Sequence, residues 1–190
     1  AIGSNDDILK QYESDSITDA KGKAVFPGFN DAHAHFVGYA MSLLTVNLVD
    51  TKSWEEVVEK CNSFAKKLPA GAWLTGRGWD QNDWAVKEFP DNTKLNELFP
   101  DRPVIITRID GHAAMANAKA LELAGVKAGD KLTGGDIEVK DGKLTGLLVD
   151  NAVDLVSSKI PEPDLVQVKK ALLQAQENCF AVGLTSLHDC

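Results

Sequence analysis

Two histidines stand two residues apart in residues 26–36, FPGFNDAHAHF, although the whole chain has only four. The Pro-Gly pair and the alternation that follows it predict a β-strand from Val25 to Phe36. Side chains at positions i and i+2 of a strand share one face. Asp31, His33 and His35 are therefore expected on one face, and the two alanines between them on the other, where a helix can pack closely.

This arrangement makes His33 and His35 candidate metal ligands. Their Cβ atoms would lie roughly 6.5–7 Å apart on a strand, and two imidazoles can converge from there on one ion with Zn–N bonds of about 2.0–2.1 Å. Asp31 lies one step deeper on the same face and could orient a ligand. A pair of ordinary histidines is the alternative, because this spacing alone is a weak signal.

Composition narrows the class of protein and its partners. The 190 residues suffice for one domain with a core or for parts of two. No apolar run approaches the ~18–20 residues that cross a membrane, so we expect no membrane partner. The net charge of −8 argues against a nucleic-acid partner. Three cysteines without CxxC spacing indicate a reducing compartment, and hence the cytoplasm.

The first residue is Ala and not Met, which is compatible with a processed start or with a cut inside a longer protein. A signal peptide ahead of it therefore stays an open alternative.

Periodicity and turn residues predict alternating strands and helices, which favours the α/β class. The stretch GRGWDQNDW at residues 76–84 is expected to be a loop, and Asp141-Gly142 predicts a tight hairpin within residues 137–146. Helices are expected at residues 53–68, 92–99, 111–124, 149–158 and 164–182, and further strands around Ile17 and at residues 72–75, 103–109 and 184–188.

Several stretches, taken together, resemble a known family. AVFPGFNDAHAHF is similar to the first barrel strand of the amidohydrolase superfamily. GRGWDQNDW, RPVIITRIDGHAAMANAKALELAGV, DGKLTGLLVDNAVDLV and AVGLTSLHDC follow in the order found in the YtcJ-like metal-dependent hydrolases, also called the amidohydrolase 3 group. Each stretch is a weak signal alone, but the set is specific and runs over nearly the whole chain.

The resemblance implies a partial (β/α)₈ barrel of the metal-dependent hydrolase type. Residues 1–25 would be a remnant of an N-terminal β-sandwich, and residues 26–36 the first barrel strand. Residues 37–160 would form an inserted α/β subdomain, and residues 161–190 a barrel helix with the second strand. A complete barrel needs roughly 250 residues, so we expect an N-terminal fragment of a longer enzyme.

The implied activity is metal-dependent hydrolysis of a non-peptide C–N bond in a small amide-like substrate. His33 and His35 match the first two ligands of a divalent metal, expected to be zinc. The family's other ligands have no counterpart here, so no catalytic set is complete in this chain. We therefore expect a site that can stand unoccupied and a chain that is inactive alone.

The RxDGH stretch borders the active-site cavity in the family, which makes Arg108, Asp110 and His112 candidate pocket residues. An internal ion pair between Arg108 and Asp110 is the alternative. Trp79 could also line the pocket, although a buried anchor is slightly favoured for it.

Two other functions stay open at this point. A barrel without its later ligands could be a non-catalytic regulatory or binding module, and the same fold also supports metal-dependent deamination of a ring. The uncovered edges of the first and last strands predict self-association.

Overall fold

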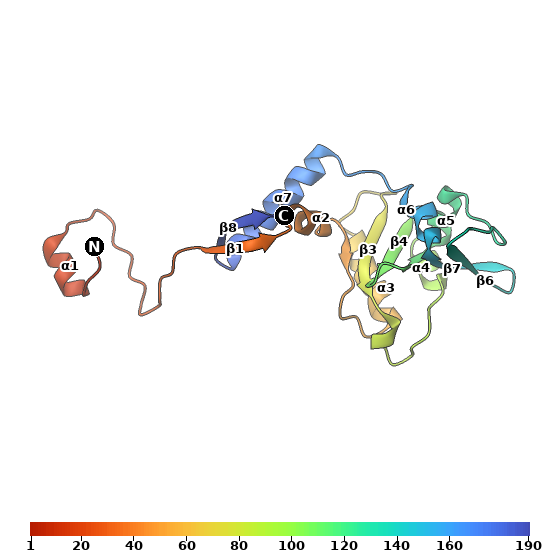
Figure 1. The fold of residues 1–190 in the computed structure, drawn as a ribbon, viewed down its shortest axis with the longest axis horizontal. Coiled ribbons are helices and arrows are strands. Elements are labelled where there is room, and N and C mark those ends of the chain that lie inside the picture. The colour runs from red at the N-terminus through yellow and green to blue at the C-terminus, as the bar shows by residue number, and fades with distance from the viewer.

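The computed structural model covers residues 1–190 and contains two β-sheets of different size (Figure 1). The smaller sheet pairs β1 (Phe29–Ala34) in parallel with β8 (Leu184–Asp189). Beside it, α2 (Phe36–Ser42) packs against α7 (Leu165–Ala181). β1 and β8 thus meet in one small unit, although most of the chain separates them in sequence.

The larger sheet has six strands in the order β2-β3-β4-β5-β7-β6. Pairing is parallel from β2 to β4 and antiparallel from there to β6, so the fold is mixed α/β, as expected. Its strands are β2 (Val46–Asn47), β3 (Leu74–Trp79), β4 (Val104–Arg108), β5 (Ala113–Ala116), β6 (Gly135–Lys140) and β7 (Lys143–Asp150). The remaining helices are α1 (Asn5–Gln11), α3 (Trp54–Ala65), α4 (Thr93–Leu98), α5 (Ala118–Ala124) and α6 (Asn151–Ser157), with a 3₁₀ turn, η1, at Gln81–Asp83. No helix combines the length and apolar character needed to span a membrane.

Each face of the six-stranded sheet buries its own core. Neighbouring residues of β4 serve opposite faces, since Ile106 belongs to the cluster with Val57 of α3 and Ile105 to the cluster with Leu121 of α5. This is the alternation that a strand buried on both sides requires.

Local sequence explains the ends of several elements. Ser53 caps α3 by accepting the Glu56 N–H at 3.1 Å, and Asp164 with Gln167 forms a capping box at the start of α7. Asp141 and Gly142 both have positive φ, 52° and 75°, which confirms the predicted tight turn between β6 and β7.

Residues 76–79 belong to strand β3, and the prediction of a loop from residue 76 is wrong. The glycines are needed because β2 and the turn that follows it approach β3 closely. A Cβ at Gly76 would lie 3.1 Å from the Val46 oxygen, and one at Gly78 would lie 2.8 Å from the Val49 nitrogen. A glycine-rich run is therefore a strand here, because its neighbours leave no room for side chains.

The helix predicted over residues 111–124 is only half right. Ala113–Ala116 form the buried strand β5, and the helix α5 begins after Asn117. Alanine favours a helix, but pairing with β4 and β7 on both sides holds these residues extended.

The strand expected around Ile17 is absent, and α1 is the only element before β1. A strand needs a partner strand to satisfy its main-chain groups, and Ile17 is 70% exposed. In Figure 1 this N-terminal segment runs away from both sheets. The strand predicted from Val25 is correspondingly shorter and starts at Phe29.

The buried thiol of Cys61 predicts a loss of stability at alkaline pH. Burial in the core raises its pKa from 9.0 to about 12. The thiol stays protonated in the folded protein, whereas the unfolded chain releases this proton above pH 9.0. Its contribution to stability is complete below that pH and falls by about 1.4 kcal/mol per pH unit above it, until the folded thiol itself ionises. In urea unfolding followed from pH ~8.5 to ~10.5, wild type should lose more stability than Cys61→Ala. Equal losses would contradict this assignment.

Candidate functional site

The histidine pair lies at the carboxyl end of β1. His33 is in the strand, and His35 is the residue that precedes α2. Their ring centroids are 5.2 Å apart, with the planes at 83°, and both side chains are exposed. The structure therefore brings the two imidazoles together on one side of the chain, as the alternation predicts.

The end of β8 closes around this pair. The Cys190 N–H donates to the Ala34 oxygen at 3.0 Å, and the Phe36 N–H donates to Asp189 Oδ1 at 2.9 Å. His35 Nδ1 lies 3.0 Å from the Cys190 oxygen, and His33 Nδ1 lies 3.4 Å from the Cys190 sulfur. The sequence pattern alone assigned Cys190 no place in a site. Parallel pairing of the two strand ends is the signal that would have placed it here.

Asp31 contacts the main chain of the pair and not its rings. Its Oδ1 accepts the His33 N–H at 3.1 Å. The carboxylate therefore fixes the backbone from which the His33 ring projects, at a point where the pairing of β1 with β8 shifts register between Asp31 and Ala34.

The donor set fits part of a site for a divalent metal. Two imidazoles side by side supply two neutral nitrogen donors, which suit zinc and related ions. No group of three or more His, Cys, Asp or Glu side chains is arranged to hold a metal. The two imidazoles fall short of the three or four protein donors that zinc sites use.

Arg108 lies in a second polar group at the carboxyl end of β4. Its guanidinium donates to Asp80 Oδ1 at 2.7 Å, to Gln81 Oε1 at 2.9 Å and to the carboxylate of Asp110. Only 14% of the Arg108 side chain is exposed. Arg108 and Asp110 therefore form the internal ion pair that was the alternative to a pocket role, and the guanidinium links the turn after β4 to the segment after β3.

His112 has the most exposed side chain of the three candidate pocket residues in the RxDGH stretch, at 74% against 14% for Arg108 and 37% for Asp110. Its Nδ1 lies 2.8 Å from Asp150 Oδ1, and its N–H donates to Asp110 Oδ1 at 3.1 Å. The Asp150 N–H in turn donates to the His112 oxygen at 2.7 Å. These bonds hold the imidazole at the same sheet edge as Arg108. No hydrogen bond or ion pair links this group to His33 or His35.

Trp79 lies entirely in the core and donates its indole N–H to the Ile106 oxygen at 3.0 Å. It packs against Trp84, with ring centroids 6.0 Å apart. The side chain anchors the end of β3, in keeping with the role slightly favoured from sequence.

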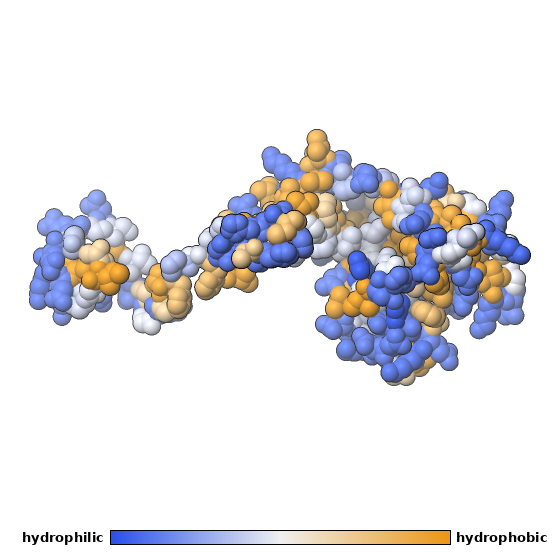
Figure 2. Space-filling view, viewed as in Figure 1, coloured by the Kyte–Doolittle hydropathy of each residue, from blue (hydrophilic) through white to orange (hydrophobic).

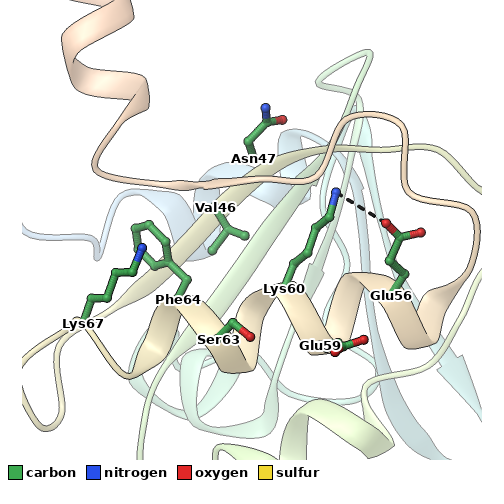
Figure 3. Close-up of a pocket in the computed structure, with 8 residues that line it drawn as sticks. All are labelled: Val46, Asn47, Glu56, Glu59, Lys60, Ser63, Phe64 and Lys67. Atoms are coloured by element: carbon green, nitrogen blue, oxygen red, sulfur yellow. Dashed lines mark ion pairs between the residues drawn. The ribbon is translucent and has the colours of Figure 1, made fainter. Parts of the chain in front are cut away.

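One surface hollow is lined by residues of neither polar group. It measures about 460 Å³ and lies between β2 and α3 (Figure 3). Lys60 and Glu56, one turn apart on α3, form an ion pair at 3.5 Å along one side of it. The hollow is lined by Val46, Asn47, Glu56, Glu59, Lys60, Ser63, Phe64 and Lys67, without histidine or cysteine, and we assign it no chemistry.

Comparison with known proteins places the chain in a family. The profile described as "Amidohydrolase family" matches residues 16–190. The chain is 34% identical to "Putative amidohydrolase YtcJ" of Bacillus subtilis over 190 residues, which cover 98% of this chain and 36% of that protein. It is 30% identical to "N-substituted formamide deformylase" of Arthrobacter pascens, covering 91% of this chain and 33% of that protein.

The chain is also similar to a solved structure of a metal-dependent hydrolase. A crystal structure of an uncharacterized metal-dependent hydrolase from Pyrococcus horikoshii matches with a TM-score of 0.58 and 28% identity, over 85% of this chain and 30% of that one. The chain thus spans about a third of the length of the proteins it matches. Because the profile matches nearly all residues of this chain, the chain belongs to the amidohydrolase family.

Proposed function

We propose that this chain supplies the front part of a metal-dependent amidohydrolase, with His33 and His35 holding a divalent metal, zinc in the first instance. The complete enzyme would hydrolyse a non-peptide C–N bond in a small amide-like substrate. The observation that carries the proposal is the pair of adjacent imidazoles at the carboxyl end of a parallel strand, in a chain similar to metal-dependent hydrolases. Barrel enzymes of this type keep their active sites at that end of their strands.

The proposed architecture makes β1 and β8 the first two strands of a (β/α)₈ barrel. Their parallel pairing supports this, and so does α7, which precedes β8 as a barrel helix would. Residues 37–160 would then be an insertion between the two strands. All six strands of the separate sheet fall within that range, from β2 to β7.

A metal bound by the pair would polarise the substrate carbonyl and lower the pKa of a bound water towards ~7. The chain's own contribution is to hold the donors. Asp31 fixes the main chain of His33, and the end of β8 fixes the ring of His35. On the substrate side, His112 is the candidate contact because its ring is exposed, whereas Arg108 and Asp110 hold the turn that carries it.

The test is an assay of the complete polypeptide that carries residues 1–190. N-substituted formamides are the first substrates to try, because a relative bears that name. We expect release of the free amine that is lost on treatment with a chelator, restored by zinc, and absent in His33→Ala/His35→Ala. His188→Ala, a histidine outside both polar groups, is the control. Hydrolysis that survives both the chelator and the double substitution would overturn the proposal.

Self-association is a further expectation of the partial barrel. Large apolar side chains are exposed on α7 and around β1, including Leu165 at 86%, Val166 at 77% and Phe29 at 58%. Figure 2 shows apolar residues at the start of α7 and on the segment that leads to β1. We propose that further parts of the same protein cover these surfaces, and that isolated copies of this chain associate through them.

Light scattering after size exclusion checks this expectation. The wild-type chain should be larger than a monomer at concentrations of order 100 µM, and Leu165→Lys/Val166→Lys should shift it towards the monomer. Leu123→Lys on α5, where the side chain is 49% exposed, is the matched control and should leave the mass unchanged. A monodisperse wild-type monomer would refute association.

A further inference from the structure

Cys190 contacts both histidines of the candidate centre. Its sulfur lies 3.4 Å from His33 Nδ1, and its oxygen lies 3.0 Å from His35 Nδ1. Its own N–H donates to the Ala34 oxygen at 3.0 Å, which fixes the residue against the end of β1. One residue therefore touches the same ring nitrogen of both imidazoles.

The chemistry of these contacts determines which nitrogen of His35 is free. A carbonyl oxygen, like that of an ionised carboxylate, can only accept a hydrogen bond, so His35 Nδ1 must carry the hydrogen in its contact with the Cys190 oxygen. In the neutral imidazole the lone pair then belongs to Nε2. A metal-binding histidine is held in this way, with one ring N–H given to a carbonyl or carboxylate and the other nitrogen left for the metal.

A thiol sulfur is a weak acceptor as well as a weak donor. If it accepts from His33 Nδ1, His33 is held in the same tautomer as His35, and both Nε2 atoms are available together. The sulfur lies on the Nδ1 side of the ring. It is thus placed to orient His33 from behind and not to share its metal-donor side.

We propose that Cys190 is a positioning residue for the metal centre. Its main-chain oxygen holds His35, its sulfur holds His33, and together they present two Nε2 atoms to one ion. This rests on the proposed metal function, but the contacts belong to the chain without metal. The carbonyl contact does not depend on the side chain, whereas the sulfur contact does. Substitution of Cys190 should therefore affect the two histidines differently.

The first experiment is long-range ¹H–¹⁵N NMR of the imidazoles in the metal-free chain, at a pH of about 8 where ordinary histidines are neutral. In wild type, His33 and His35 should both be Nδ1–H tautomers. In Cys190→Ala, His33 should lose this preference and His35 should keep it. Cys190→Ser, which restores an acceptor, should bring His33 back in part. Cys179→Ala on α7 is the control and should change neither. An Nε2–H tautomer for His33 in wild type, or no change in Cys190→Ala, would overturn the proposal.

The second experiment measures metal binding. Zinc affinity should fall about tenfold in Cys190→Ala, the lower end of the effect known for groups that orient a ligand. Cobalt(II) bound to wild type should lack a sulfur-to-metal charge-transfer band, and such a band would overturn the proposal by making Cys190 a ligand. If the complete polypeptide that carries residues 1–190 binds no metal while the tautomers behave as expected, the proposed function fails and the positioning contact stands. If metal binds equally well in wild type and Cys190→Ala, the positioning role fails and the function stands.

Discussion

Replacement of Asn117 by alanine is expected to lower the free energy of unfolding by about 4 kcal/mol, one of the largest effects of any single substitution in this chain. The side chain is wholly buried and makes four hydrogen bonds. Its Oδ1 accepts the N–H groups of Val104 and Ala120, at 2.9 and 3.0 Å. Its Nδ2 donates to the oxygens of Phe99 and Arg102, at 2.9 Å each.

The expected loss of unfolding free energy in Asn117→Ala has two parts. The Ala120 bond caps α5, and loss of such a cap costs about 1 kcal/mol. The other three bonds satisfy main-chain groups of β4 and of the segment that follows α4, and each buried group left without a partner costs about 1–3 kcal/mol, less any relaxation. Urea unfolding measures the sum. Asn62→Ala, an exposed asparagine on α3, should change stability by less than about 0.5 kcal/mol. A loss below about 1.5 kcal/mol for Asn117→Ala would show that water or local rearrangement replaces these bonds.

The double substitution His33→Ala/His35→Ala is expected to weaken zinc binding more than about 100-fold, beyond what loss of an orienting group alone causes. In our account both imidazoles supply donors to the same ion. Each single substitution should therefore already remove one of the two donors. Unfolding stability should change little, because both side chains are exposed.

Competition with a metallochromic dye gives the affinity of each variant. His112→Ala/His188→Ala removes the other two histidines and is the matched control. The control should bind zinc as wild type does. Equal weakening in both double variants would mean that zinc binds histidines of this chain without selection, and the centre at β1 would lose its support.

Much of the secondary structure could be predicted because its determinants are local. The hairpin depends on Asp141-Gly142, a pair that two-residue hairpin turns favour and that adopts positive φ here. Helices α3 and α7 begin at capping residues that can be recognised within four positions of sequence.

The elements that were missed depend on partners far away in sequence. Ala113–Ala116 is extended only because β4 and β7 lie on either side of it, and the glycines of β3 have meaning only beside Val46 and Val49. Ile17 shows the converse, since a β-branched residue without a partner strand forms no strand.

The candidate centre also has one part that could be predicted from the sequence and one part that could not. The histidine pair follows from the period of a strand and could be predicted, and the structure places the two rings side by side. The part played by Cys190 could not, because it arises from the parallel pairing of β1 with β8. Strand order is a property of the whole fold, and no spacing within either segment encodes it.

Zinc K-edge X-ray absorption of the zinc-loaded chain, beside His33→Ala/His35→Ala, tests the central claim most directly. We predict a first shell of nitrogen and oxygen at about 2.0–2.1 Å with the scattering pattern of two imidazoles, absent from the variant, and no sulfur at about 2.3 Å. A shell without imidazole, or one that is unchanged in the variant, would contradict the assignment of the metal to His33 and His35.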